Sequence, residues 1–158
     1  MKILLTAFRN TSSERLINCF SENYCKIILE NDKLMSECQL EEILSRDKYD
    51  FVLSLGQRPV MKNKLFVEVC ARDGARIIFT DFDYETLLNN FTDCGVEAKL
   101  SRNAGTSFCN NIYRFGLDHL EKTETKMIFV HIPFEKNISD FELFAENVKK
   151  AVSKTFYS

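Results

Sequence analysis

Apolar runs of strand length alternate with amphipathic helical segments along the 158-residue chain. Short continuous apolar runs are typical of buried strands, whereas apolar positions that recur at helical spacing are typical of helices packed on a sheet. The pattern predicts strands at 2–8, 25–30, 50–56, 64–71, 75–81, 96–101 and 126–134. It predicts helices at 11–22, 38–47, 83–95, 106–122 and 139–154.

Residues that commonly begin or end helices lie at some of these boundaries. Gly95 ends the helix at 83–95, as glycine often does, and Ser139 is placed to cap the last helix. The alternation of strands and helices predicts an α/β fold, a three-layer α/β/α sandwich around a mostly parallel or mixed twisted sheet. Ligands of such sheets bind beyond the carboxyl ends of the strands, so residues at those ends are the first candidates for a site.

The composition indicates one globular domain over residues 1–158, without a linker, repeat or low-complexity segment. Hydrophobic residues make up 45% of the chain and charged residues 28%, which is enough apolar content for a sizeable core. The formal net charge of -2 argues against a surface for nucleic acid or anionic membranes. No apolar run reaches membrane-spanning length, and the N-terminal apolar segment is too short for a signal-peptide core, so we expect a cytoplasmic protein.

The six cysteines include no CxxC pair, and the chain has only two histidines. This combination argues against a zinc site of ordinary spacing, and we expect no metal and no cofactor. Several cysteines lie inside apolar runs, so we expect reduced, mostly buried thiols rather than disulfides.

Cys109 is the cysteine best placed for nucleophilic chemistry. The turn at 104–106 precedes the helix that carries it, and Thr106 is positioned to cap that helix. A helix N-terminus favours a thiolate, and the same free N–H groups can bind an oxyanion. We therefore expect a lowered pKa for the Cys109 thiol.

His131 and Glu68 are the candidate partners of this thiol. His131 follows an apolar strand segment and could accept a proton, while Glu68 interrupts another apolar strand, where a charge is costly without a partner. Cys109 and His131 point to one rim of the sheet if the strands at 96–101 and 126–134 are parallel neighbours. Taken singly, each residue has a structural alternative: an inert packed thiol, a hydrogen-bonded histidine, and a glutamate on a solvated strand face.

Two segments resemble the signature of the pyroglutamyl peptidase I family: RNAGTSFCNNIY at 102–113 and FVHIPF at 129–134. The opening MKILLTAF is similar to the first strand of that family, and LFVEVCARDGARI is similar to the segment that holds its catalytic glutamate. The resemblance runs in order through nearly the whole chain and identifies it as a shortened, divergent member. It implies Cys109 as nucleophile, His131 as base and Glu68 as the acid that orients the base.

The resemblance also implies an α/β/α fold without metal, and an activity that removes pyroglutamate from peptides with a blocked N-terminus. For the pocket, it implies that Phe8 and Gln57 contact the substrate and that Arg76 lies near the oxyanion. Three segments depart from the family pattern: the loop after Phe8, the stretch RPVMKNK after Gln57, and the segment after Ile77. A second phenylalanine of the pocket is therefore missing or comes from elsewhere.

These departures leave three functions open. The first is a cysteine peptidase acting on pyroglutamyl or similar blocked peptides, and the second is a non-catalytic relative that has lost the substrate pocket. The third is a cysteine amidase or thioesterase for another small acyl substrate, because the chemistry of the three residues is shared. The shortened segment after Ile77 also leaves self-association into a homo-oligomer open.

Overall fold

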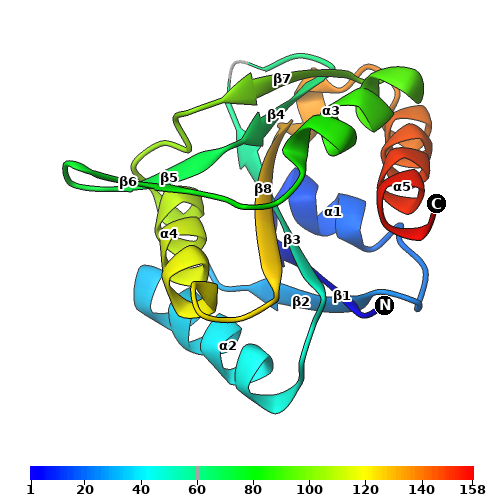
Figure 1. The fold of residues 1–158 in the computed structure, drawn as a ribbon. Coiled ribbons are helices and arrows are strands. Elements are labelled where there is room, and N and C mark those ends of the chain that lie inside the picture. The colour runs from blue at the N-terminus through cyan, green and yellow to red at the C-terminus, as the bar shows by residue number, and fades with distance from the viewer. Residues whose placement is uncertain (60) are drawn as a thin grey trace.

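The computed structural model describes residues 1–59 and 61–158, and Figure 1 shows their path. Six strands form the central sheet in the order β2-β1-β3-β8-β4-β7, and two more form a separate hairpin. The strands are β1 Ile3–Phe8, β2 Cys25–Leu29, β3 Phe51–Arg58, β4 Lys64–Glu68, β5 Cys70–Asp73, β6 Arg76–Phe79, β7 Glu97–Ser101 and β8 Lys126–Pro133. The helices are α1 Ser12–Ile17, α2 Lys33–Arg46, α3 Tyr84–Asp93, α4 Phe108–Leu120 and α5 Phe141–Tyr157, with a 3-10 turn at Glu135–Asn137.

Apolar side chains fill the middle of the sheet. Every residue of β1 is buried, and β3 and β8 are buried over most of their length. Parallel strands that are covered on both faces need such continuous apolar runs. β1 pairs in parallel with β2 and β3, and β3 pairs in parallel with β8. The predicted α/β/α class with a mostly parallel sheet is therefore confirmed.

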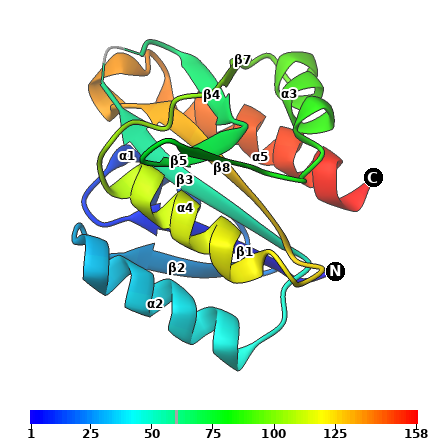
Figure 2. The same cartoon turned by 60° about the vertical axis from the view of Figure 1, so that its left-hand side comes forward.

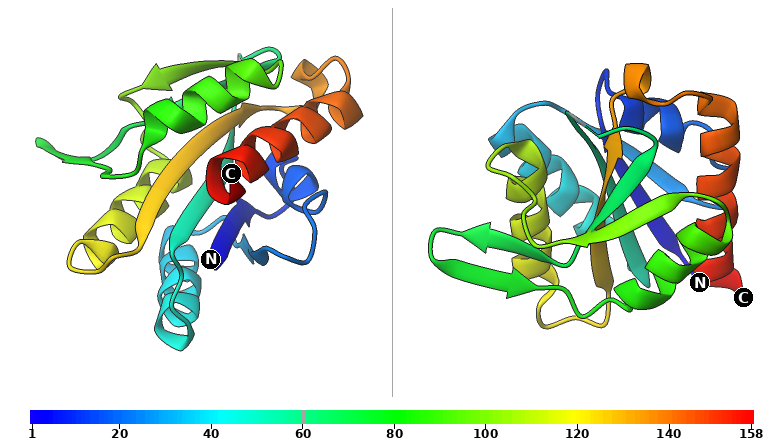
Figure 3. Two further views of the ribbon diagram at one scale, coloured as in Figure 1. Left: turned by 45° about the vertical axis from the view of Figure 1, so that its right-hand side comes forward. Right: turned by 90° about the horizontal axis from the view of Figure 1, so that it is seen from above.

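Helices cover both faces of this sheet (Figure 2, Figure 3). α2 and α4 pack side by side on one face, through an apolar cluster that includes Leu40 and Tyr113. α1, α3 and α5 cover the other face through a larger cluster that includes Leu16, Phe91 and Phe144. Within the described residues, none of the helices combines the length and the apolar character that crossing a bilayer requires.

The strand predicted at 64–71 is two strands in the structure. β4 ends before Val69, whose N–H donates to the carbonyl of Ser101 (2.9 Å), and β5 begins at the next residue. β5 then pairs antiparallel with β6 as a hairpin that projects from the sheet (Figure 1). Arg72 and Asp73 explain this exit, because both are exposed in the hairpin and would lose their hydration inside a covered sheet.

Several helix boundaries differ from the predicted ones because other residues act as caps. The carboxylates of Asp32 and Asp140 each accept a backbone N–H from the first turn of the following helix. α2 therefore begins at Lys33 instead of residue 38, and α5 is capped by Asp140 instead of Ser139. α1 is shorter than predicted and ends at Ile17.

β7 is not a neighbour of β8. β4 lies between them, antiparallel to β8 and parallel to β7. The expectation that the strands at 96–101 and 126–134 are parallel neighbours is therefore wrong. The loop at 102–107 still carries the chain to the end of β3, where Nη1 of Arg58 donates to the carbonyl of Asn103 (3.1 Å).

All six cysteines are free thiols, but only Cys70 and Cys109 are buried. Cys38 is exposed and the remaining three are half-buried. The prediction of mostly buried thiols is therefore wrong, because cysteines inside locally apolar runs also fall on the outer faces of edge strands and helices.

Candidate active site

Glu68 and His131 form a buried pair on the face of the sheet that α2 and α4 cover. Nδ1 of His131 lies 2.8 Å from Oε1 of Glu68, and the exposed fractions of the two side chains are 4% and 0%. In the antiparallel ladder Glu68 stands opposite Phe129 and His131 opposite Phe66, so the pair is a diagonal contact between adjacent strands. The carboxylate holds the Nδ1 side of the ring, which leaves Nε2 to exchange a proton.

Cys109 reaches the same place from α4. It is the second residue of that helix, after Ser107 in the cap position, so the predicted cap Thr106 lies one residue too early. A Cβ on Gly56 would lie 2.5 Å from the Cys109 Sγ atom, so the thiol sits directly on β3. Gly56 is paired in register with His131 on β8, and neighbouring strands are about 4.8 Å apart. The structure thus brings Cys109, His131 and Glu68 together.

Burial dominates the protonation of the Cys109 thiol. It raises the pKa of Cys109 from its ordinary value of 9.0 to about 12, and the charge of Glu68 acts in the same direction. The guanidinium of Arg58 and the backbone N–H of Cys109 lower this pKa, but they do not offset the burial. The expectation of a lowered pKa is therefore wrong for the resting protein. The thiol holds its proton at neutral pH, so it becomes a nucleophile only when a base removes that proton.

A pocket of about 390 Å³ opens beside this thiol. Its volume lies in the usual range for small-molecule sites. Three of the residues proposed from the sequence line it together: Phe8, Gln57 and Cys109. The other lining residues are Arg9, Asn10, Thr11, Asn31, Pro59, Ser107, Phe108 and Phe134.

Aromatic rings form much of the pocket wall. The ring centroids of Phe8 and Phe108 are 6.4 Å apart with an interplanar angle of 37°. Phe134 lines the pocket from the chain that follows β8. Phe108 and Phe134 therefore supply the aromatic wall that the short loop after Phe8 lacks.

Gln57 presents one end of its amide to this pocket. Its Oε1 accepts the N–H of Ser12 (3.0 Å), and the hydroxyl of Ser12 donates to the carbonyl of Pro133 (2.6 Å). Because the carbonyl end of the amide is held in this way, Nε2 is left as a donor. Among the described residues Nε2 has no hydrogen-bond partner, so a ligand acceptor could take that place.

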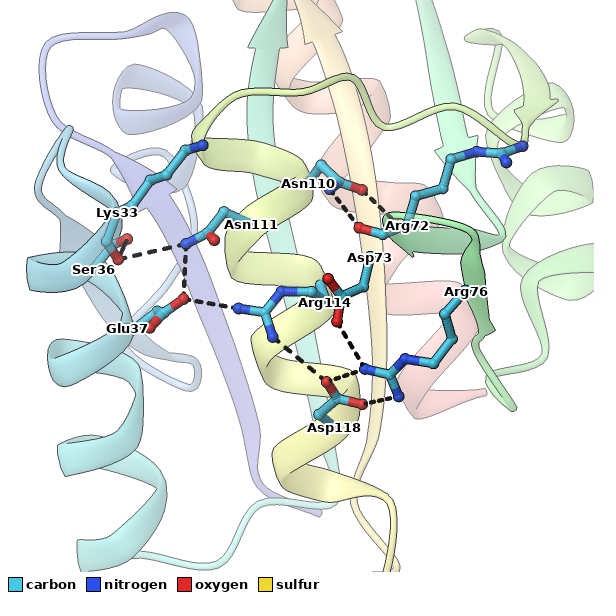
Figure 4. A network of polar contacts seen from close by, with 10 residues as sticks. All are labelled: Lys33, Ser36, Glu37, Arg72, Asp73, Arg76, Asn110, Asn111, Arg114 and Asp118. Atoms are coloured by element: carbon cyan, nitrogen blue, oxygen red, sulfur yellow. Dashed lines mark hydrogen bonds and ion pairs between the residues drawn. The ribbon is translucent and has the colours of Figure 1, made fainter.

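The structure does not bring Arg76 to this site. Arg76 belongs to the projecting hairpin, where its guanidinium pairs with Asp118 (2.8 Å) and Asp73 (3.2 Å) (Figure 4). Asp118 lies nine residues beyond Cys109 on α4, which corresponds to about 13 Å along the helix. The same network continues through Arg114 to α2. The position of Arg76 near an oxyanion, expected from the sequence, is therefore not what the structure shows.

Arg58, Gly56 and Phe108 belong to the site but were not identified from the sequence. Nη1 of Arg58 lies 3.4 Å from Oε1 of Glu68, so Arg58 is the arginine that contacts the Glu68–His131 pair. The alternation of side chains along β3 was a usable signal, because it places residues 56 and 58 on the same face of the strand. Phe108 directly precedes Cys109, and a large apolar residue next to a nucleophile was a further usable signal.

A larger cavity, about 860 Å³, lies at the opposite end of the sheet. It is lined by the loops around Asp47–Phe51 and His119–Lys126, and none of the six proposed site residues lines it. Parallel α/β sheets bind ligands at the carboxyl ends of their strands, whereas this cavity faces the amino ends of β3 and β8. The smaller pocket beside Cys109 is therefore the candidate active site.

Comparison with known proteins places the site in a family context. The family model for pyroglutamyl peptidase matches residues 60–145, which is more than half of the chain. A pyrrolidone-carboxylate peptidase of Staphylococcus haemolyticus is 27% identical over an alignment of 201 residues. The alignment covers 98% of this chain and 94% of that protein. Another, of Thermosipho melanesiensis, is 24% identical over 175 residues, which cover 87% and 85%. Among solved structures, a mutant pyrrolidone carboxyl peptidase of Pyrococcus furiosus has a TM-score of 0.82 at 18% identity over 98% of both chains, a likeness in fold.

Proposed function

Because the chain belongs to the pyroglutamyl peptidase family, we propose that it is a cysteine peptidase that removes pyroglutamate from blocked peptide N-termini. The observation that carries the proposal is the buried Glu68–His131 pair next to a thiol that lines a pocket. A base held by a carboxylate beside a nucleophile is the arrangement that acyl transfer requires. The substrate partner is a peptide with a blocked N-terminus.

Cys109 is the nucleophile in this proposal and His131 is the proton carrier. His131 takes the thiol proton as the S–C bond forms, and gives it to the leaving amine as the C–N bond breaks. This half-reaction leaves a thioester on Cys109 and releases the shortened peptide. Water then attacks the thioester and gives a proton to His131, which returns it to the Cys109 sulfur as pyroglutamate leaves.

The first turn of α4 supplies donors for the oxyanion. The first N–H groups of a helix have no partner within the helix, and Cys109 is the second residue of α4. These groups lie next to the sulfur that forms the new bond, where negative charge develops on the carbonyl oxygen. The backbone N–H of Cys109 already lowers the pKa of its own thiol, which supports an orientation toward the reacting atoms.

The pocket suits a small ring with one strong acceptor. Phe8, Phe108 and Phe134 offer apolar faces to the ring, and Nε2 of Gln57 offers a donor to the lactam carbonyl. A mostly apolar site with a few convergent polar groups selects a ligand by the one hydrogen bond that it must complete. The same three residues, Cys109, His131 and Glu68, would also act on other small acyl amides, so the ring substrate needs a matched comparison.

One observation favours a second candidate, a relative that binds blocked N-termini without cleaving them. The pKa of Cys109 is raised to about 12, so the resting thiol is weakly nucleophilic. Binding without turnover would agree with this observation.

Hydrolysis of a fluorogenic pyroglutamyl amide tests the proposal. We expect turnover by the wild type, loss of turnover in Cys109→Ser, and retention in Cys70→Ser, a matched control because Cys70 is the other buried thiol. A prolyl amide, which lacks the lactam carbonyl, should be cleaved far more slowly. Iodoacetamide labelling followed by peptide mapping identifies the thiol whose alkylation abolishes turnover.

The remaining outcomes separate the alternatives. A thermal shift with free pyroglutamate but no turnover would favour the non-catalytic relative, and faster cleavage of another acyl amide would favour the amidase. The absence of both turnover and a thermal shift would contradict the proposed function.

A cytoplasmic location is also part of the proposal, in keeping with six free thiols. Self-association remains a proposal that sedimentation would test.

A further inference from the structure

Arg58 provides a positive charge to the buried carboxylate of the site. Its Nη1 lies 3.4 Å from Oε1 of Glu68, the same oxygen that Nδ1 of His131 contacts at 2.8 Å. We propose that Arg58 is a positioning residue, which holds the charge of Glu68 so that His131 rests as a neutral base. This inference rests on the proposed function, in which His131 must accept the proton of Cys109.

Three contacts fix the guanidinium of Arg58 in this place. Besides Glu68, it donates to the carbonyl of Asn103 (3.1 Å) and stacks over the ring of Phe66, 5.3 Å from the ring centroid. The side chain is 32% exposed, so it bridges solvent and the buried pair. Loop, strand and aromatic ring thus hold the charge in place before substrate binds.

The charge of Glu68 needs compensation inside the fold. Its side chain has no exposed surface, and its Oε2 has no hydrogen-bond partner among the described residues. A buried carboxylate in this situation favours a positive neighbour, because an unpaired buried charge is costly. Without Arg58 that neighbour would be His131 as an imidazolium, and an imidazolium has no lone pair with which to take a proton.

No other group that faces the pair supplies a positive charge. Cys109 and Tyr113 approach from α4 and Cys70 from β5, and burial raises the pKa of all three, so they are neutral at pH 7. Within the described chain, Arg58 is the only lysine or arginine that pairs with Glu68. The next arginines are directed elsewhere: Arg72 donates to the carbonyl of Arg102 in the loop after β7, and Arg102 lies over the Phe79 ring.

Arg58 also acts on the thiol. Its guanidinium lowers the pKa of Cys109 against the effect of burial, so it favours the thiolate that proton transfer produces. This effect on the thiol adds to the contact with Glu68, which is the main role that we assign to Arg58.

Nuclear magnetic resonance of the histidine rings tests this inference without substrate. The chain has two histidines, and His119 lies at the far end of α4 and stacks on Phe115, so it is an internal control. In Arg58→Gln and Arg58→Met we expect the titration midpoint of the His131 ring to rise by roughly one pH unit. His119 should not move, Arg58→Lys should stay near wild type, and Arg114→Gln should leave both midpoints unchanged.

The acid limb of the pH profile of kcat/KM should move with His131. If kcat falls by the same factor at every pH and the titration midpoint of His131 does not move, the inference is overturned. Arg58 would then have a structural role. Melting temperatures show whether Arg58→Gln or Arg58→Met fails to fold. If one of them does, the other variant provides the test. If the His131 midpoint moves although no variant or wild type cleaves the pyroglutamyl amide, the role of Arg58 stands and the proposed function fails.

Discussion

The Sγ atom of Cys109 lies so close to Gly56 on β3 that a Cβ on Gly56 would stand only 2.5 Å from it. The same Cβ would lie 2.7 Å from the ring of Phe129. Real Cβ atoms do not approach other atoms so closely, so β3 needs a glycine here for α4 to seat the thiol. A backbone position on one strand thus determines where the Cys109 thiol of a distant helix can lie.

Gly56→Ala should displace the Cys109 thiol and lower turnover at least tenfold, because a shift of about 1 Å at a reacting atom is costly. Overpacking of a buried site typically costs about 1–3 kcal/mol of the free energy of unfolding. Enzyme kinetics and urea denaturation of the same preparation measure both effects. Gly116→Ala is the matched control, since its Cβ would also collide, with Met127 at 2.3 Å, but away from Cys109. Equal turnover in both variants would contradict the role of Gly56.

Glu68→Gln should separate activity from stability. The amide keeps the shape of the side chain but can present an N–H to Nδ1 of His131, which favours the wrong ring tautomer for a base. We expect kcat to fall by about 10² to 10⁴, the range of a lost general base. The melting temperature should be unchanged or higher, because an incompletely paired buried charge is removed. A large drop in melting temperature would show that the pair is mainly structural.

Gln57→Glu tests the donor in the pocket. The new carboxylate can still accept the N–H of Ser12, but it replaces the Nε2 donor with an acceptor. An unmade hydrogen bond to a lactam carbonyl costs about 1–3 kcal/mol, so KM for the pyroglutamyl amide should rise about tenfold to 100-fold. Steady-state kinetics should show a smaller change in kcat. An unchanged KM would remove Gln57 from the substrate contacts.

The raised pKa of Cys109 predicts a loss of stability in alkali. A group whose pKa is about 12 in the folded state and 9.0 in the unfolded state contributes fully below pH 9, and loses this contribution as pH rises toward 12. The free energy of unfolding of the wild type should therefore fall by about 1 kcal/mol more than that of Cys109→Ser between pH 9 and 10. Urea titrations of both proteins measure this difference. The tyrosines and Cys70 are common to both, so parallel curves would contradict a buried, protonated thiol.

Arg76→Gln should leave kcat/KM for the pyroglutamyl amide unchanged. The guanidinium of Arg76 pairs with Asp118 and Asp73 (Figure 4). Asp118 lies nine residues beyond Cys109 on α4, so this network is distant from the thiol. Steady-state kinetics of this variant beside Arg58→Gln compares the arginine expected from the sequence with the one that the structure places at Glu68. A selective loss of kcat in Arg76→Gln would restore the sequence-based assignment.

Local patterns were sufficient to predict most elements of the fold. The apolar runs of β1, β3 and β8 specify buried strands whatever their neighbours are, because such runs gain most of their free energy from burial. Gly95 adopts the left-handed backbone (φ 82°) expected of the residue after a helix. Boundaries were missed at α2 and α5, where Asp32 and Asp140 outcompete other candidate caps through hydrogen bonds that depend on the local turn.

The sequence by itself determined the α/β class and the three residue types that the proposed acyl transfer requires: the thiol of Cys109, the imidazole of His131 and the carboxylate of Glu68. Only the tertiary structure decided how they meet. The insertion of β4 between β8 and β7 and the seating of α4 on Gly56 are contacts between distant parts of the chain. The pairing of Glu68 with Arg58 instead of Arg76, and the raised pKa of Cys109, follow from burial and charge in three dimensions, which no local pattern encodes.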